Sequence, residues 1–230
     1  MSSTRTVNIE RNVIPHAPGS AEVTFGNTRV ICVATIAEEV PSWLKGSGRG
    51  WVTAEYSMLP GSTRTRCMRE RRGAKGRTSE IERLIGRSLR ACVDLDRLGG
   101  EVTVTVDCDV LVADGGTRTA AITGAYVALY DALRFWKTAA KINALPINGQ
   151  VAAVSVGLVG AETVTDLDFG QDSRAEVDMN VVMDDQGRYI EIQGTAEQAP
   201  FTDEQLADML AAARTAIDEL LATQREVLEI

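Results

Sequence analysis

A strand, a glycine turn and a strongly apolar helix follow one another between residues 101 and 136, and this run constrains the fold more than any other. Residues 101–112 alternate between apolar and polar side chains and are rich in Val and Thr, which is typical of a β-strand. Asp114-Gly115-Gly116 predicts a sharp turn after it. Residues 119–136 predict a helix that is apolar nearly all round and therefore buried. The run favours sheets that pack on helices.

The remainder of the first half predicts more strands and one long helix. Strands are expected at residues 21–25, 30–36 and 51–58. The Gly26-Asn27 pair predicts a tight hairpin between the first two. Ser79 and Glu82 fit a capping box, which predicts a helix that begins at Ser79 and ends at Gly99-Gly100. The apolar face of this helix is expected to comprise Ile81, Ile85, Cys92 and Leu95.

The second half predicts a central strand, a hairpin and a C-terminal helix. The strand is expected at residues 151–158 and the hairpin at residues 175–183 and 189–193. Thr202 and Gln205 are expected to cap the helix. No low-complexity linker divides the 230 residues. We therefore predict an α+β fold with one compact domain, residues 1–230, in which mixed β-sheets pack on helices.

The charge of the chain is unevenly distributed, although its net value is −8. Residues 44–90 contain 12 basic and 4 acidic side chains, a local net charge of +8. Residues 161–230 contain 4 basic and 17 acidic side chains, a local net charge of −13. Local patches, and not the total charge, steer a polyanion, so the first stretch is compatible with RNA binding. The alternative is that both stretches are ordinary solvated surfaces.

The scarcity of histidine narrows the possible chemistry. The one histidine, His16, lies in a turn-like His-Ala-Pro-Gly sequence and is expected to be a turn or capping residue. The cysteines form no CxxC pair and have no nearby histidine, so no zinc site is expected. Neither a signal peptide nor an apolar run of about 18 residues is seen, so we expect a cytoplasmic protein without a membrane span.

The glycine turn at residues 114–119 has the features of a phosphate cradle. Its paired glycines permit positive φ and a close approach of the backbone to a ligand. The following helix N-terminus offers free N–H groups, and a hydroxyl and a guanidinium lie beside it. The candidate phosphate-binding residues here are Gly116, Thr117, Arg118 and Thr119. The alternative is a plain turn in which Thr119 caps the helix.

Two further features have candidate roles at the same site. Arg77 precedes a predicted helix and is expected to point at the same anion, although it is also compatible with an ordinary loop arginine. Asp172 and Asp178 lie in an acidic stretch, and Asp178 shares a strand face with Glu176 and Asn180. Grouped carboxylates hold Mg²⁺ or donate a proton to a leaving oxygen. The alternative is a solvated strand face.

A basic loop is predicted between residues 61 and 75. Contacts from such a loop to RNA phosphates give affinity with little sequence preference. The candidate RNA-binding side chains are Arg64, Arg66, Arg69, Arg71 and Arg72. The alternative is a solvated loop without a ligand.

Taken in order, these motifs resemble the ribonuclease PH family over nearly the whole chain. The resemblance rests on Arg11-Asn12, His16, KGSGRGW (45–51), TAEYSMLP (53–60), GRTSEI (76–81), RLIGRSLR (83–90), DCDVLVADGGTRTAA (107–121), DSRAEVDMNVVM (172–183) and QGTAE (193–197). It implies mixed sheets packed on helices in two similar βαβα-like halves, the fold also called ribosomal-protein domain-2-like. It also implies a ring-shaped homohexamer, a trimer of dimers.

The activity implied by the resemblance is phosphate-dependent 3′→5′ trimming of tRNA precursors, with release of nucleoside diphosphates. The family's phosphate-binding residues fall on Arg77, Thr117 and Arg118, and its Mg²⁺-associated aspartates fall on Asp172 and Asp178. Its tRNA-contacting arginines fall on Arg66 and Arg69. This chain departs from the family at Gly61, where a basic residue is usual, and in a shortened N-terminal segment.

Two other functions remain open at this point. A non-catalytic RNA-binding subunit of an exosome-like ring is the first, but such subunits typically lose the phosphate arginines or the aspartates, which this chain retains. A small-molecule kinase of related architecture is the second, but the glycine- and serine-rich ATP loop it requires is not found.

Overall fold

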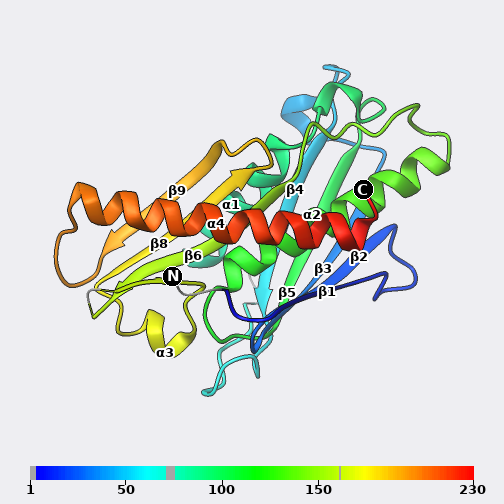
Figure 1. Ribbon diagram of the computed structural model, residues 1–230. Coiled ribbons are helices and arrows are strands. Elements are labelled where there is room, and N and C mark those ends of the chain that lie inside the picture. Colours follow the sequence, from blue (N-terminus) through cyan, green and yellow to red (C-terminus); the bar gives the residue numbers. More distant parts are fainter. Residues whose placement is uncertain (1–3, 71–75, 161) are drawn as a thin grey trace.

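Alternating apolar and polar side chains build the first sheet, whose strands all come from the first half of the chain. The computed structural model describes residues 4–70, 76–160 and 162–230 (Figure 1). The five strands are β1 (Val7–Arg11), β2 (Gly19–Phe25), β3 (Thr28–Ala37), β4 (Trp51–Met58) and β5 (Thr103–Val112). They lie in the order β1-β2-β3-β5-β4. In β5 every second residue is buried, as the predicted strand requires.

Helix α1 (Arg77–Ala91) connects the two parallel strands of this sheet. Strands β4 and β5 pair in parallel, and the other pairs in the sheet are antiparallel. A parallel pair requires a crossover connection, which α1 supplies. Two short 3-10 helices, η1 (Ser42–Leu44) and η2 (Leu95–Arg97), lie in the connections on either side of β4 and α1. This crossover and the β5–α2 turn bring the first residues of two helices toward the same end of the sheet (Figure 1).

The second sheet is antiparallel throughout. Its strands are β6 (Val151–Val159), β7 (Glu162–Thr165), β8 (Val177–Asp184) and β9 (Tyr189–Ala196), in the order β7-β6-β8-β9. Helix α3 (Phe169–Asp172) lies between β7 and β8 and has a single turn. Eight of the nine residues of β6 are buried, because helices cover both faces of the sheet at this strand.

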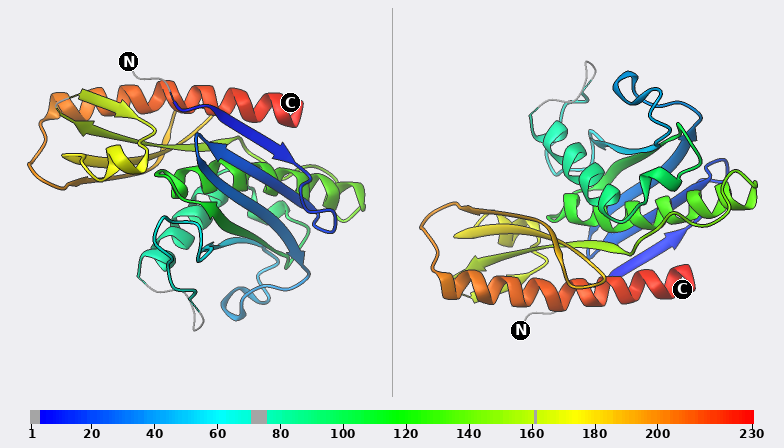
Figure 2. Two further views of the ribbon diagram at one scale, coloured as in Figure 1. Left: turned by 90° about the horizontal axis from the view of Figure 1, so that it is seen from below. Right: turned by 90° about the horizontal axis from the view of Figure 1, so that it is seen from above.

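Helix α2 (Thr117–Thr138) lies between the sheets and contacts β2, β3 and β5 on one side and β6 on the other. Fifteen consecutive residues from Thr119 to Leu133 are buried, which confirms the prediction of a helix that is apolar nearly all round. Helix α4 (Asp203–Leu228) covers the second sheet and lies beside β1 (Figure 2). Buried side chains from both sheets and from α1, α2 and α4 form one continuous core.

The structure confirms the predicted α+β fold with two similar halves. The first half contains β1–β2–β3–β4–α1–β5–α2, and the second contains β6–β7–α3–β8–β9–α4, so each half has strands, a helix, one or two further strands and a second helix, in that order. The predicted hairpin at Gly26, the strand at Trp51–Met58 and the capping box of Thr202 are all present. His16 lies exposed in a turn.

The predicted boundaries of α1 were wrong at both ends. The helix begins at Arg77, after an N-cap glycine with a φ of +44°, and Ser79 forms no cap. The Glu82 carboxylate accepts a hydrogen bond from the Tyr56 backbone N–H at 3.4 Å and not from its own helix. The helix ends at Ala91 because the chain then forms an isolated bridge between Val93 and Ile147. Among the described residues, no helix has the length and apolar character needed to cross a membrane.

Candidate active site

A cavity of about 650 Å³ opens where the N-termini of α1 and α2 meet α3 and β8. Five of the predicted site residues in its wall carry polar side chains, and the sixth is a glycine. They are Arg77, Gly116, Thr117, Arg118, Asp172 and Asp178. These six residues, which are up to 101 positions apart in the sequence, therefore line one space. Thr119 is not part of the wall, since its hydroxyl donates to the Gly116 carbonyl at 2.9 Å and supports the turn from behind.

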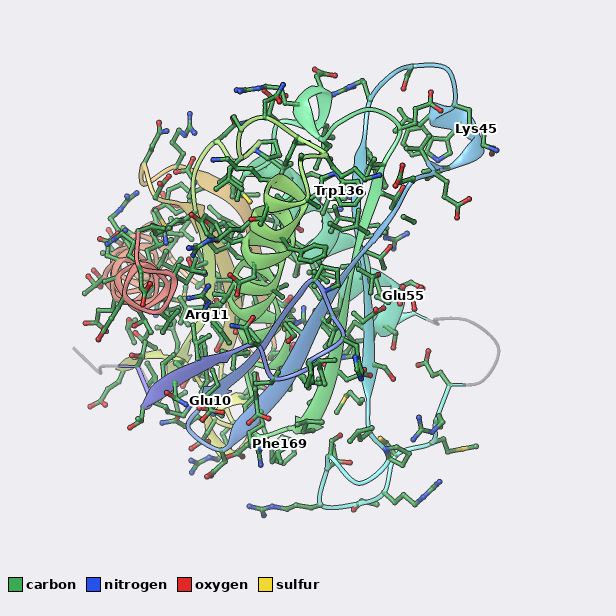
Figure 3. The ribbon with its side chains drawn as sticks, turned by 90° about the vertical axis from the view of Figure 1, so that its right-hand side faces the viewer. Glu10, Arg11, Lys45, Glu55, Trp136 and Phe169 are labelled. Atoms are coloured by element: carbon green, nitrogen blue, oxygen red, sulfur yellow. The ribbon has the colours of Figure 1, made fainter. Side chains whose placement is uncertain are left out.

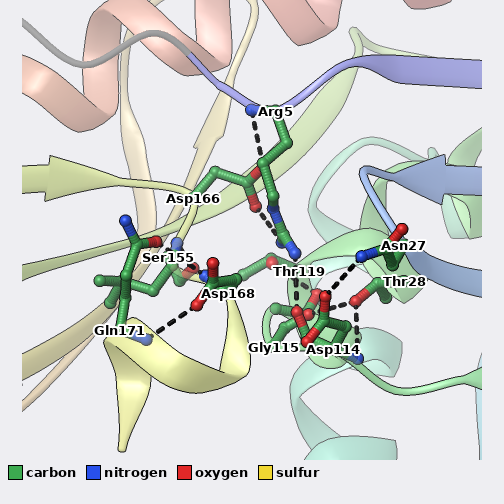
Figure 4. Close-up of polar contacts among 12 residues, drawn as sticks. Arg5, Asn27, Thr28, Asp114, Gly115, Thr119, Ser155, Asp166, Asp168 and Gln171 are labelled. Atoms are coloured by element: carbon green, nitrogen blue, oxygen red, sulfur yellow. Dashed lines mark hydrogen bonds and ion pairs between the residues drawn. The ribbon is translucent and has the colours of Figure 1, made fainter. Parts of the chain in front are cut away.

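The glycine turn adopts a backbone conformation that side chains would disrupt. Gly115 and Gly116 have φ values of +77° and +63°. A Cβ on Gly115 would lie 2.3 Å from the Leu167 carbonyl oxygen, so this turn packs directly against the segment that leads into α3. The Thr28 hydroxyl donates to the Gly115 carbonyl at 2.6 Å and accepts from the Asp114 N–H at 3.0 Å (Figure 4). The turn is thus held rigidly at the N-terminus of α2.

Thr117 is oriented by a buried tyrosine that sequence reasoning did not single out. The Tyr56 hydroxyl lies 2.8 Å from Thr117 Oγ1 and donates to it. Burial raises the pKa of Tyr56, which keeps its proton in place. Because Thr117 Oγ1 accepts this hydrogen bond, its own hydrogen is free to point at a ligand in the cavity. No sequence signal pairs these two residues, which are 61 positions apart.

The two arginines face the same space. The Arg118 side chain is 15% exposed, and its Nη1 lies 3.4 Å from Gln193 Oε1 and 3.7 Å from Glu80 Oε1. Arg77 is exposed at the first position of α1. The positive charges of both arginines lower the pKa of Tyr56 and of Asp178, in opposition to the effect of burial. Both guanidinium groups therefore act on the same cavity from two helix N-termini, where an anion is favoured.

The two carboxylates that line the cavity, those of Asp172 and Asp178, come from the second half of the chain. Asp172 ends α3, whose start is fixed by a capping box between Asp168 and Gln171. Asp178 lies near the start of β8. Burial, followed by the charges of Asp172 and Glu197, raises the pKa of Asp178 to about 6. Asp178 is therefore partly protonated near neutral pH when no cation is bound.

The donor set suits Mg²⁺. Within the part of the chain that the structure describes, no group of three or more His, Cys, Asp or Glu side chains gathers as a metal cage. Mg²⁺ is commonly held by one or two carboxylates together with water and substrate phosphates. The charge of Asp172 raises the pKa of Asp178, and a divalent cation held by these residues would relieve this repulsion.

Two smaller cavities extend the site on either side of Arg77. One of about 480 Å³ runs past Arg118 and Asp178 to β9. Another of about 420 Å³ runs along Met58 to Cys67 and Met68 in the loop after β4. Arg64, Arg66 and Arg69 are exposed on that loop, but they line none of these three cavities. Arg71 and Arg72 lie outside the described residues.

Fold and site together define an α+β protein with a candidate active site for an anionic substrate, built between two halves. Comparison with known families matches the 3′ exoribonuclease family, domain 1, to residues 3–134 and domain 2 of the same family to residues 149–216. The chain therefore belongs to the 3′ exoribonuclease family, which is the ribonuclease PH family.

Several solved structures share the fold. Rice (Oryza sativa) Rrp46 has a TM-score of 0.77 at 17% identity, over 98% of this chain and 96% of that one. An Archaeoglobus fulgidus exosome with RNA bound to the active site has a TM-score of 0.81 at 22% identity, over 98% and 89%. An archaeal exosome core has a TM-score of 0.76 at 22% identity, over 97% and 87%. At these identities the likeness establishes the fold alone.

Proposed function

We propose that this protein is a phosphate-dependent 3′→5′ exoribonuclease that trims tRNA precursors and releases nucleoside diphosphates. Membership of the 3′ exoribonuclease family supports the class of reaction. The observation that carries the proposal is the shared cavity: Arg77, Thr117 and Arg118 from the first half of the chain line it together with Asp172 and Asp178 from the second half. The first group suits a phosphate ion, and the second suits a divalent cation.

The first task of the site is to bring two anions together. Inorganic phosphate and the RNA backbone repel each other, so their encounter requires positive charge between them. Arg77 and Arg118 supply that charge, the N-terminus of α2 supplies N–H donors, and Thr117 supplies a hydroxyl whose orientation is fixed by Tyr56. Seating phosphate in this way raises its effective concentration beside the scissile bond.

The second task is the displacement itself. An oxygen of the phosphate bonds to the phosphorus of the last phosphodiester, and the bond from that phosphorus to the preceding 3′ oxygen breaks. The proton lost by the attacking phosphate passes to that 3′ oxygen, and one of the two carboxylates that line the cavity, Asp172 or Asp178, is suited to carry it. Asp172 and Asp178 would hold Mg²⁺, which when bound supplies charge that stabilises the transition state.

The proposed macromolecular contacts follow from the surface around the cavity. Arg64, Arg66 and Arg69 are exposed on the loop whose residues Cys67 and Met68 line the cavity of about 420 Å³. We propose that these arginines, together with Arg71 and Arg72, contact the phosphates of the tRNA backbone. We further propose a homohexameric ring, a trimer of dimers, which the structural likeness to exosome cores supports. Each subunit would act as a single domain, since its halves share one core.

The proposal is tested by incubation of the protein with a 3′-extended tRNA, with and without phosphate and Mg²⁺. Release of nucleoside diphosphates that requires phosphate is expected. RNA binding in a gel-shift assay without nucleotide release would instead identify a non-catalytic ring subunit, and release without phosphate would identify a hydrolase.

A further inference from the structure

Arg5 joins the phosphate-binding turn to the segment that carries the carboxylates, although it lines none of the cavities described above. Its guanidinium forms a bidentate ion pair with Asp166, with Nε 2.8 Å from Oδ2 and Nη2 2.6 Å from Oδ1 (Figure 4). Its Nη1 donates to the Asp114 carbonyl at 2.7 Å. The Asp166 side chain is fully buried, and that of Arg5 is 19% exposed.

Both partners of Arg5 lie within three residues of the cavity lining, Asp114 beside Gly115 and Asp166 before Phe169. Asp114 begins the glycine turn, and a Cβ on Gly116 would lie 3.2 Å from Arg5 Nη2. Asp166 has a φ of +56°, and its N–H donates to the Ser155 carbonyl at 2.6 Å. The chain then runs directly from Asp166 into the N-cap of α3, which ends at Asp172. One guanidinium thus fixes the spacing between the phosphate side and the carboxylate side.

We propose that the Arg5–Asp166 ion pair is a positioning clamp that sets the affinity of the turn for inorganic phosphate. This inference rests on the proposed function, because it assumes that the turn binds phosphate. The planar guanidinium makes three hydrogen bonds in one rigid fork, which an ammonium group cannot reproduce. The clamp acts through the turn and does not itself touch phosphate.

The chain contains a matched control for this test. Arg11 forms a bidentate pair with Asp131 at 2.9 and 2.5 Å and donates to the Val227 carbonyl at 2.7 Å. Its side chain is also 19% exposed, and Asp131 is nearly as buried as Asp166. Yet this second pair ties β1 to the later turns of α2 and to α4, away from the glycine turn.

The experiment compares Arg5→Met, Arg5→Lys and Arg11→Met with the wild-type protein. Melting temperature and the dissociation constant of inorganic phosphate, from calorimetric titration, are measured for each. We expect both Met variants to melt at lower temperature, and only Arg5→Met to bind phosphate about 10-fold or more weakly. Arg5→Lys should also bind phosphate weakly, because lysine keeps the positive charge but cannot form the three hydrogen bonds of the planar guanidinium.

Each other outcome contradicts the clamp. Wild-type affinity in Arg5→Met would overturn it while the proposed function stood. If Arg11→Met bound phosphate as weakly as Arg5→Met, the lower affinity would result from a general loss of stability. If Arg5→Lys bound phosphate as tightly as the wild-type protein, the positive charge alone would account for the effect. Failure of the wild-type protein to bind phosphate would overturn both the clamp and the proposed function.

A second inference rests on a different observation, an aromatic ring left exposed in the cavity wall. Phe169 is 55% exposed, yet it lines the same cavity as Arg118 and Asp172. It is the first residue of α3, whose capping box holds the backbone in place. In Figure 3 it lies at the end of the molecule from which the loop after β4 extends. Met58 and Thr63, at the base of that loop, line the cavity with it.

We infer that Phe169 is a stacking platform for the nucleobase at the RNA 3′ end, which again rests on the proposed function. An apolar ring beside phosphate-binding and carboxylate side chains matches a nucleotide, which carries a flat base beside its phosphate. Stacking accepts any base, so it suits an enzyme that removes successive nucleotides. Phe135 provides a control, because it is 52% exposed but lies near the end of α2 and lines none of the three site cavities.

The test uses an RNA with 2-aminopurine at its 3′ end, without phosphate so that no turnover occurs. Wild-type protein should quench the fluorescence on binding, and Phe169→Ala should bind roughly 5- to 100-fold more weakly with little quenching. Phe169→Trp should retain RNA binding, Phe135→Ala should behave as wild type, and phosphate affinity should not change.

Unchanged RNA affinity in Phe169→Ala, or a changed oligomeric state without a change in RNA affinity, would overturn the platform alone. Absence of RNA binding by the wild-type protein would also overturn the proposed function.

Discussion

The two halves of the molecule have similar orders of elements but bring opposite charges to the same cavity. In the first half, α1 and α2 point their N-termini at it and contribute Arg77 and Arg118. In the second half, α3 has only four residues, and its last residue, Asp172, lines the cavity together with Asp178 of β8. One half is suited to hold an anion and the other to hold a cation.

The comparison explains why the site requires both halves. The carboxylates alone would repel phosphate and RNA, and the arginines alone would bind phosphate without charge stabilisation at the leaving oxygen. The pKa of Asp178 reflects the charges from both halves, because burial and Asp172 raise this pKa while Arg118 and Arg77 lower it. Variants that remove charge from the two halves should therefore have opposite effects on the affinity for inorganic phosphate, although both should lower turnover.

The largest expected effect is that of Arg118→Ala, which removes positive charge from the first half. Phosphate-dependent kcat/KM should fall by about 1,000-fold or more, because the guanidinium stabilises charge in the transition state. The fold should be retained, since Arg118 makes only a 3.4 Å hydrogen bond and a 3.7 Å ion pair. Release of nucleoside diphosphates is the measurement, and Arg188→Ala, on the exposed turn between β8 and β9, is the control. Near-wild-type activity in Arg118→Ala would exclude this residue from the site.

Removal of negative charge from the second half should separate turnover from phosphate binding. Asp178→Asn is expected to lower kcat by about 100-fold, because a proposed cation ligand and candidate proton carrier is lost. In the absence of Mg²⁺ it should nevertheless bind phosphate more tightly than the wild-type protein, since a repelling carboxylate is gone. Calorimetric titration with phosphate measures this difference. Weaker phosphate binding by Asp178→Asn would contradict the proposal that the second half repels phosphate.

The same variant should alter the pH dependence of stability. The folded-state pKa of Asp178 is raised to about 6, so the folded protein holds this proton more tightly than the unfolded chain. The ionised carboxylate therefore lowers stability as pH rises, with the full cost above about pH 6. Without Mg²⁺, Asp178→Asn should raise the free energy of unfolding by about 2–3 kcal/mol at about pH 8 and by little at about pH 4. Urea unfolding at both pH values tests this, and a gain independent of pH would contradict it.

A smaller effect is expected from the exposed loop of the first half. Replacement of Arg64, Arg66 and Arg69 together by Gln should raise the KM for tRNA by about 10-fold and reduce its dependence on salt. A short oligonucleotide that does not reach the loop should be cleaved as before, because these arginines line none of the three cavities. Steady-state kinetics at several salt concentrations distinguish this effect from damage to the site. An equal loss on the short substrate would place the loop inside the catalytic machinery.

The smallest effect is that of Tyr56→Phe, which removes one hydroxyl behind Thr117. Loss of the 2.8 Å hydrogen bond leaves the Thr117 hydroxyl free to rotate, so the KM for phosphate should rise by about 3- to 10-fold. The KM for RNA should not change. Parallel titrations of phosphate and RNA in the kinetic assay measure both constants, and a change confined to RNA would show that Thr117 does not face phosphate.

Local sequence signals predicted those parts of the fold and site that depend on neighbouring residues. The strand–turn–helix run around Gly115 and Gly116, the strand at Trp51–Met58 and the cap at Thr202 all follow from short-range rules, and the structure contains them. The start of α1 was missed because Ser79 and Glu82 fit a capping box equally well, whereas tertiary contacts direct Glu82 to Tyr56.

Contacts between distant segments could not be predicted. The Arg5–Asp166 pair spans 161 positions and the Tyr56–Thr117 pair spans 61. Arg77 and Asp178 are 101 positions apart, and they line one cavity only because the two halves of the chain pack together. The motifs identify which residues are present, and only the fold shows that they meet.

The most direct test of the account follows the phosphorus atom. The wild-type protein is incubated with a 3′-extended tRNA, Mg²⁺ and ³²P-labelled inorganic phosphate, and the released nucleotides are separated. If phosphate seated by Arg77 and Arg118 is the attacking group, the label should appear as the terminal phosphate of nucleoside diphosphates. Unlabelled nucleoside monophosphates as the product would contradict the account, because water and not phosphate would then have attacked the RNA.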